Sequence, residues 1–393
     1  MNEKIRFRRD FHMSNKSAIP FNKPFKIGNE LENIQKAIEW GHLSGGGKFS
    51  EAAESFFRKK FGVKNAVLTS SCTDALEMVA LLLNIQPGDE IIAPSFAFVS
   101  TVNPFVMRGA KIVFADSCDN HPNINVETIQ ELITPKTRAI ICIHYSGMAC
   151  DVERLLEICK ENNIHLIEDA AHAIDATWKG SQYLGTFGSF GTFSFHETKN
   201  IISGEGGMLC VNDEQFFERA DIIVEKGTNR RSFFRGETSK YEWVDIGSSF
   251  RASELTAAFL MAQLIEKEKI LKKRILLWNL YYENLSELAS SGCFSLPQIP
   301  ENASNNGHIF YLVLNSESDR IQLIKALADE NILAVFHYQS LHKSPFYKGK
   351  HDNRPLPNAD RFSSCLLRLP LFYELDEAGV NRICHCIESF FKG

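Results

Sequence analysis

The sequence predicts an α/β protein whose larger part is a mainly parallel sheet with helices on both faces. Between Ala66 and Val211, short β-rich runs alternate with amphipathic runs of helical length. This alternation is typical of strand–helix–strand units, which build parallel sheets covered on both sides. A chain of 393 residues is also long for one core, which predicts a second, smaller domain.

Roughly seven strands are expected in the large sheet. In chain order they are AVLTS, EIIAPSF, KIVFAD, AIICIHY, HLIEDA, GTFSFH and GMLCV. Two of the intervening runs, residues 73–85 and 151–163, carry apolar residues at helical spacing. Thr73 and Asp151 are the expected N-caps of these helices, because their side-chain oxygens can accept hydrogen bonds from the free backbone N–H groups.

The pattern changes after residues 244–253. Residues 254–289 form a charged amphipathic stretch, which predicts one long or kinked helix joining two domains. Beyond them, residues 308–314 predict a strand, and residues 319–332 and 375–393 predict helices of a small α+β domain. The expected division is an N-terminal extension (1–18), a large domain (19–250), a long connecting helix (251–290) and a small C-terminal domain (291–393).

Composition narrows the possible partners. The formal net charge is −5, with 44% hydrophobic and 23% charged residues, so a nucleic-acid or anionic-membrane surface is not expected as the main partner. Ten cysteines occur without a CxxC pair, which favours a reducing compartment. No signal peptide and no run of about 18 apolar residues is found, so we expect a cytoplasmic protein without a membrane span.

Polar groups follow several of the expected strands, where ligands of such sheets bind. Ser71, Cys72 and Thr73 open a helix whose free N–H groups suit a phosphate. Asp169 ends the strand HLIED and needs a cation or hydrogen-bond donors if it is buried; the alternative is a helix cap. Lys199 follows the strand GTFSFH, where a solvated turn lysine is the alternative.

Together these groups suit one ligand that carries a phosphate, a ring cation and an aldehyde. Pyridoxal 5′-phosphate has all three. The amine of Lys199 could condense with the aldehyde if it is partly desolvated, and the carboxylate of Asp169 could keep the ring nitrogen protonated. The glycines of GEGG (204–207) would let the chain turn tightly beside the cofactor, although a plain turn would use the same residues.

The segments EDAAHA (168–173), FSFHETKN (193–200) and GEGGML (204–209) resemble, in this order, the DegT/StrS family of pyridoxal-phosphate sugar aminotransferases. The resemblance runs from about Ile19 to the C-terminus. It implies the type I aminotransferase fold, a homodimer, and transfer of an amino group from L-glutamate to a keto sugar attached to a nucleoside diphosphate.

The resemblance also implies a role for each matching residue. Lys199 would bond to the aldehyde and move a proton, Asp169 would face the pyridine nitrogen, and His172 would lie near the phenolic oxygen. Phe98 would stack on the ring, although a core phenylalanine would also fit the pattern. The expected phosphate contacts are Ser71, Cys72, Thr73 and Ser194, with Ser249 reaching across the dimer at a position where the family often has asparagine.

Substrate contacts are expected from two further segments. Arg230, in EKGTNRRSFFRG, could clamp a diphosphate, with a solvated loop as the alternative. By resemblance, Tyr338 and His342 would close over the nucleotide sugar, although a packed strand and turn would look the same. Cys384 and Cys386 lie at i and i+2 of an expected helix and point apart, so we expect no metal there.

Within the family the chain most resembles enzymes that act at carbon 4 of dTDP-4-dehydro-6-deoxyglucose, and its FHETKN segment differs from the HPTKN form associated with many carbon-3 enzymes. The resemblance therefore implies this 4-keto sugar as the acceptor, with a product of galactose configuration. The gluco epimer and a reaction at carbon 3 remain alternatives. A sugar dehydratase of the same family would carry histidine in place of Lys199. A pyridoxal-phosphate-binding regulator would need a longer N-terminal segment than this chain has.

Overall fold

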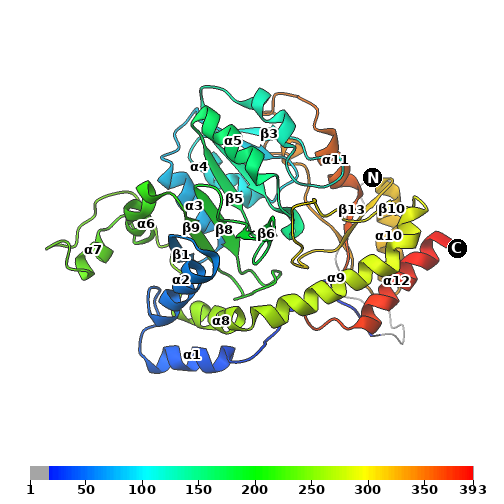
Figure 1. The fold of residues 1–393 in the computed structure, drawn as a ribbon, viewed down its shortest axis with the longest axis horizontal. Helices are drawn as coiled ribbons and strands as arrows, with labels where there is room; N and C mark the ends of the chain where they lie inside the picture. Colours follow the sequence, from blue (N-terminus) through cyan, green and yellow to red (C-terminus); the bar gives the residue numbers. More distant parts are fainter. Residues whose placement is uncertain (1–16, 393) are drawn as a thin grey trace.

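The computed structural model describes residues 17–392, so residues 1–16 of the expected N-terminal extension lie outside the described part. Its centre is a seven-stranded sheet in the order β1-β9-β8-β5-β4-β2-β3 (Figure 1). The strands are Asn65–Thr69 (β1), Glu90–Pro94 (β2), Lys111–Ala115 (β3), Thr137–Ile143 (β4), His165–Asp169 (β5), Phe190–Ser194 (β8) and Gly207–Val211 (β9). Only β9 runs against its neighbours, which confirms the predicted mainly parallel sheet.

Alternate side chains of the strands point to opposite faces of the sheet and pack into two apolar layers. One face packs against α3 (Cys72–Leu82), α4 (Asn103–Met107) and α6 (Phe217–Val224). The opposite face packs against α2 (Lys48–Phe61), α5 (Val152–Asn162) and α8 (Glu254–Ile265). Both faces are therefore covered, as the near-continuous apolar runs of the strands predict.

Of the two predicted N-caps, the one of α5 is confirmed and the one of α3 is wrong. Asp151 caps α5 as predicted, with its Oδ1 accepting from the backbone N–H of Arg154 at 3.0 Å. The prediction for Thr73 is wrong, because α3 begins at Cys72 and Ser71 is its N-cap, accepting from the N–H of Asp74 at 3.0 Å. Ser71 and Thr73 both satisfy the cap preference, and the extended backbone of Ser71 decides between them.

The long amphipathic stretch is a kinked helix. α8 ends at Ile265, and α9 (Lys267–Ser290) begins after Glu266. α8 packs against α1 (Glu30–Glu39) and α2, whereas α9 runs beneath the molecule to pack against α12 (Glu377–Lys392) (Figure 1). A nearly buried ion pair between Lys267 and Asp175, 2.7 Å long, joins the start of α9 to the loop after β5.

The C-terminal part holds a four-stranded antiparallel sheet in the order β10-β11-β13-β12. The expected strand is present as β11 (Tyr311–Leu314), and the expected helices as α10 (Glu317–Asp329) and α12. β10 (Phe294–Ser295), β12 (Val335–Phe336) and β13 (Leu366–Arg368) are short and were not expected. The predicted domain boundaries themselves stay a prediction.

The remaining elements are α7 (Arg230–Phe234), α11 (Pro357–Cys365) and a small hairpin of β6 (Thr177–Trp178) and β7 (Gln182–Tyr183). Within residues 17–392, no helix combines the length and apolar character that crossing a bilayer requires.

Candidate active site

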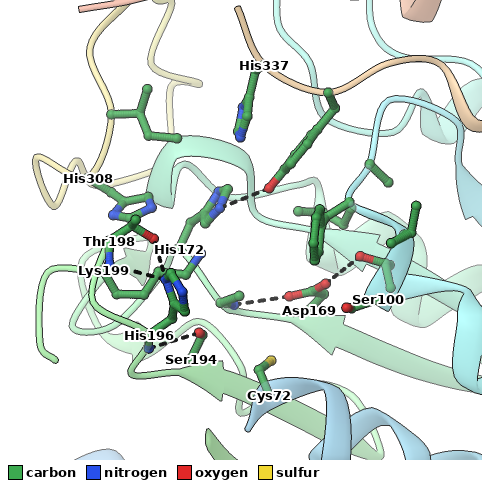
Figure 2. A pocket seen from close by; sticks show the side chains of 18 of the residues that line it. Cys72, Ser100, Asp169, His172, Ser194, His196, Thr198, Lys199, His308 and His337 are labelled. Atoms are coloured by element: carbon green, nitrogen blue, oxygen red, sulfur yellow. Dashed lines mark hydrogen bonds between the residues drawn. The ribbon is translucent and has the colours of Figure 1, made fainter. Parts of the chain in front are cut away.

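A cavity of about 1000 Å³ lies at the carboxyl ends of the parallel strands. Residues that follow β1, β2, β5 and β8 line one side of it, and residues of the small sheet, together with Phe21, line the other. Figure 2 shows Lys199, His172 and Asp169 facing this cavity from separate segments of the chain. Parallel strands bring their carboxyl ends to one edge, which is why segments distant in sequence meet here.

Lys199 reaches the cavity from the turn that follows β8. Its backbone N–H donates to the carbonyl oxygen of His196 at 2.9 Å, and Gly204, with a φ of +83°, turns the chain back beside it. Among residues 17–392 no hydrogen bond or ion pair to its Nζ is found. Burial, assisted by the charge of Arg368, lowers the pKa of this amine to about 8, against the raising effects of Cys72 and Asp169.

The lowered pKa predicts the pH dependence of cofactor uptake. Only the unprotonated amine attacks an aldehyde, so the fraction of reactive Lys199 should rise between about pH 7 and pH 9. We expect the initial rate of pyridoxal phosphate uptake by the apoprotein, followed by visible absorbance from pH 6 to pH 10, to have its midpoint near pH 8. Nα-acetyllysine is the control, and a midpoint as high as that of this free side chain would contradict the assignment.

Asp169 lies at the end of β5 and is 6% exposed. Its Oδ2 accepts a hydrogen bond from Thr101 Oγ1 at 2.7 Å, and its Oδ1 accepts from the N–H of Ala171 at 3.1 Å. Burial raises the pKa of the carboxyl in spite of these bonds. No cationic side chain in the described part of the chain forms an ion pair with it, so a cationic ligand here would stabilise the carboxylate.

The start of α3 offers backbone donors to an anion. The N–H groups of Cys72 and Thr73 belong to the first helical turn and have no acceptor within the helix. Gly207 of β9 passes so close that a Cβ on it would lie 2.4 Å from the carbonyl of Ser71. Ser194 and Thr73 also line the cavity, so hydroxyl groups are available beside the helix dipole to a phosphate bound there.

His172 and Tyr338 form a hydrogen-bonded pair over the cavity. His172 Nδ1 accepts from the backbone N–H of Ser146 at 3.3 Å, and its Nε2 lies 3.2 Å from Tyr338 Oη (Figure 2). Burial, with the charges of Lys199 and Arg368, places the pKa of His172 well below its ordinary value, so the ring is neutral. Nε2 therefore carries the proton and donates to Tyr338, whose own hydroxyl proton is free to be donated into the cavity.

The structure brings most of the predicted site residues together. Nine line the cavity: Ser71, Cys72, Thr73, Phe98, Asp169, His172, Ser194, Lys199 and Tyr338. Phe98 is 54% exposed, with its ring centroid 6.1 Å from that of Tyr338. Its predicted stacking on a cofactor ring stays a prediction.

Three predicted residues do not line the cavity of this chain: Ser249, Arg230 and His342. His342 is buried outside it, with its Nδ1 2.7 Å from Ser95 Oγ. Arg230 and Ser249 are exposed in the segment between β9 and α8. Their predicted ligand contacts remain predictions.

Other lining residues were missed: Thr101, His308, His337 and Arg368. Thr101 is a hydroxyl residue just after PSFAFVS, and its spacing from Phe98 could have indicated it. The other three come from the small sheet and its loops, where no local motif indicates that the chain returns to the large sheet.

Cys142, His144 and Cys150 form a separate buried cluster whose ligand-type atoms lie within 4.8 Å of one another. His144 Nε2 lies 2.9 Å from Glu168 Oε2, and its Nδ1 accepts from the N–H of Cys150 at 3.2 Å. Both ring nitrogens therefore have partners, and Cys142 and Cys150 belong to the apolar layer against α5. We assign no metal to this cluster.

The residues of the cavity fit pyridoxal 5′-phosphate. Lys199 supplies an amine with a lowered pKa, Asp169 a buried carboxylate that forms no ion pair with a cation among residues 17–392, and the start of α3 free N–H groups. These three features face one cavity from three strand ends, and they suit an aldehyde, a ring nitrogen and a phosphate respectively.

Comparison with known proteins agrees with this fit. Residues 25–388 match the model of the DegT/DnrJ/EryC1/StrS aminotransferase family. The chain is 30% identical over 378 residues to GDP-perosamine synthase of Escherichia coli O157:H7, covering 95% of this chain and 99% of that protein.

Two solved structures share the fold. The aminotransferase TlmJ from Streptoalloteichus hindustanus has a TM-score of 0.88 and 27% identity, covering 96% of this chain and 99% of that one. The PLP form of the putative sugar aminotransferase Spr1654 from Streptococcus pneumoniae has a TM-score of 0.87 over 96% and 99% of the two chains; at 22% identity it shows the fold alone.

Proposed function

The chain belongs to the DegT/DnrJ/EryC1/StrS aminotransferase family, and on this premise we propose that it transfers the amino group of L-glutamate to carbon 4 of dTDP-4-dehydro-6-deoxyglucose. As a member of this family it is a pyridoxal-phosphate-dependent sugar aminotransferase. The proposed product is dTDP-4-amino-4,6-dideoxygalactose. The observation that carries the proposal is the Lys199 amine, which has a lowered pKa, has no hydrogen bond or ion pair among the described residues, and lines the same cavity as Asp169.

Bound pyridoxal phosphate supplies an aldehyde that takes up an amino group and a ring that accepts the electrons released when a proton leaves carbon. Lys199 would hold the cofactor and, when its amine is free, take the proton from the α-carbon of the donor. In the second half of the reaction the same amine would deliver a proton to the sugar carbon, which sets the configuration of the product. Its lowered pKa suits both tasks near neutral pH.

Two other groups would support this proton transfer. Asp169, held by Thr101 and the N–H of Ala171, would keep a proton on the ring nitrogen. The free hydroxyl proton of Tyr338 would be donated to an oxygen within the cavity, because His172 already donates to the Tyr338 oxygen. The start of α3 would hold the phosphate through its free backbone N–H groups.

The choice of sugar rests on the segments FHETKN, EKGTNR and DIGSSF, which resemble those of dTDP-4-amino-4,6-dideoxygalactose transaminase. The relative named GDP-perosamine synthase favours a second candidate, a GDP-linked keto sugar. The gluco epimer and an amine at carbon 3 are the other outcomes that the test must separate.

The test is to incubate the holoenzyme with L-glutamate and a panel of dTDP- and GDP-linked keto sugars, and to identify each product by NMR. We expect an amine only from dTDP-4-dehydro-6-deoxyglucose, with the small H3–H4 coupling of an axial C4 amine. A large coupling would indicate the gluco epimer. A product from the GDP-linked sugar alone, or an amine at carbon 3, would contradict the proposed acceptor.

The proposal includes a homodimer in which Ser249 and Arg230 reach the cavity of the neighbouring subunit. Both lie outside the cavity of their own chain. The segment around them exposes large apolar side chains, among them Phe234 at 73% and Trp243 at 82% exposure, which a second subunit would cover. A monomer in sedimentation that retains full activity would contradict shared sites.

A further inference from the structure

We propose that His308 accepts a hydrogen bond from the C3 hydroxyl of the acceptor sugar, and so favours a sugar that carries a hydroxyl beside its reacting carbon. The inference rests on the proposed function, because it concerns the keto sugar that enters the same cavity. His308 precedes β11 of the small sheet and lines the cavity. It is a buried histidine to which the proton transfers described above give no task.

Asn200 determines which nitrogen of the His308 ring carries the proton. The Nδ2 of Asn200 donates to the carbonyl oxygen of Asn306 at 2.9 Å. A carbonyl oxygen can only accept, so this contact identifies the amide nitrogen and leaves the amide oxygen, Oδ1, for His308. Asn200 Oδ1 lies 2.8 Å from His308 Nδ1. The amide oxygen has no proton to give, so His308 Nδ1 must be the donor of this hydrogen bond.

The other ring nitrogen of His308, Nε2, is therefore an acceptor. Burial, together with the nearby charge of Lys199, holds the pKa of His308 well below its ordinary value, so the ring carries a single proton. That proton lies on Nδ1, and Nε2 keeps a lone pair. No residue from 17 to 392 forms a hydrogen bond with Nε2. A ligand in the cavity can therefore donate a hydrogen bond to this atom but cannot accept one from it.

His172, the neighbour of His308, has the opposite arrangement. Its Nδ1 accepts from the N–H of Ser146, its Nε2 donates to Tyr338, and its ring centroid lies 4.4 Å from that of His308. The cavity thus presents one donor, the Tyr338 hydroxyl, and one acceptor, His308 Nε2. A keto oxygen and a hydroxyl on neighbouring carbons match these two groups in kind, because the keto oxygen accepts and the hydroxyl donates.

The position of His308 relative to Lys199 indicates which hydroxyl this is. Asn200 directly follows Lys199 in the chain and bonds to the His308 ring, so this ring lies close to the segment that carries the reacting amine (Figure 2). In dTDP-4-dehydro-6-deoxyglucose the reacting carbon has one neighbour with a hydroxyl, carbon 3, because carbon 5 carries the methyl group. The ionised carboxylates of L-glutamate have no proton to donate, so the lone pair of Nε2 does not suit the amino donor.

The test measures, by calorimetry with the holoenzyme, the binding of two sugar nucleotides that cannot react: dTDP-6-deoxygalactose and its 3-deoxy analogue. His308→Asn is the informative variant, because the shorter amide can still donate to Asn200 Oδ1 but has no atom at the position of Nε2. His165→Asn is the matched control. His165 also bonds through Nδ1, which lies 3.0 Å from Ser189 Oγ, and it does not line the cavity.

We expect the parent enzyme and His165→Asn to bind the 3-hydroxy sugar about tenfold more tightly than the 3-deoxy analogue, the effect of one hydrogen bond to a buried acceptor. In His308→Asn the two affinities should agree within about twofold. A preference that persists in His308→Asn, or that the parent enzyme lacks, would overturn the inference and leave the proposed function in place. Binding of neither sugar nucleotide to the parent enzyme would overturn the proposed acceptor, and the inference with it.

A second measurement separates sugar binding from a structural role. Conversion of the cofactor by L-glutamate, followed by visible absorbance, does not involve the sugar, so His308→Asn should keep kcat/KM for L-glutamate within about twofold of the parent value. In the same variant kcat/KM for the keto sugar should fall about tenfold. An equal fall in both reactions would contradict the inference, because His308 would then support the structure of the whole site.

Discussion

Lys199→Ala is expected to lower turnover by roughly four orders of magnitude or more, because in the proposed reaction one amine would both hold the cofactor and transfer the proton at each half of the reaction. The fold should survive the change, since the Lys199 Nζ has no hydrogen bond or ion pair among the described residues. The measurement is the rate of product formation together with the melting temperature of the apoprotein, which we expect to stay within about 2 °C of the parent value.

Two comparisons make this prediction specific. Lys160→Ala removes an exposed lysine of α5 that does not line the cavity, and it should leave the rate unchanged. Added methylamine should restore part of the activity of Lys199→Ala, because a free amine can enter the space left by the side chain and accept the proton. Full activity in Lys199→Ala without added amine would contradict the proposed role of Lys199 in holding the cofactor and transferring the proton.

Asp169→Asn is expected to slow proton removal from the donor on the order of 1000-fold, since the amide cannot hold a proton on the ring nitrogen by charge. The amide oxygen can still accept from the N–H of Ala171, so the local backbone should remain in place. The measurement is a single-turnover reaction with L-glutamate, in which the loss of the visible absorbance of the cofactor gives the rate. Cofactor affinity should fall as well, because the charge partner of the ring is lost.

The matched control is Thr101→Val, which removes the hydrogen bond to Asp169 Oδ2 and keeps the carboxylate. We expect a loss of about tenfold, the effect of one charge-assisted hydrogen bond. An equal loss in both variants would indicate that the hydrogen bond, and not the charge, supports the reaction. Rates near the parent value in Asp169→Asn would contradict the proposed role of the carboxylate.

The large sheet could be predicted because each of its strands is a short apolar run bounded by a helix or a turn. All seven expected runs overlap an observed strand. The small sheet could not be predicted in the same way, because β10, β12 and β13 have only two or three residues. β10 and β13 form through pairing with β11, and β12 forms through pairing with β13. Strands this short are too short to show an alternation of apolar and polar residues, so tertiary contacts determine whether they form.

The residues of the candidate site also fall into those that local sequence could predict and those that it could not. Lys199, Asp169 and the start of α3 could be predicted, because each follows a recognisable strand of one parallel sheet. Arg368 and His308 could not be predicted, since they reach the cavity only after α9 carries the chain to the small sheet and back. Ser249 and Arg230 are a third case: their predicted contacts depend on a second subunit, which one chain cannot supply.

The most direct test of the central claim is to reduce the holoenzyme with borohydride, digest it, and locate the cofactor by mass spectrometry. Reduction makes the bond between the cofactor and its lysine permanent. We expect the added mass on Lys199, in the peptide that contains HETKN, and on no other lysine. Added mass on a different lysine, or none on a protein that retains its visible absorbance, would contradict the account.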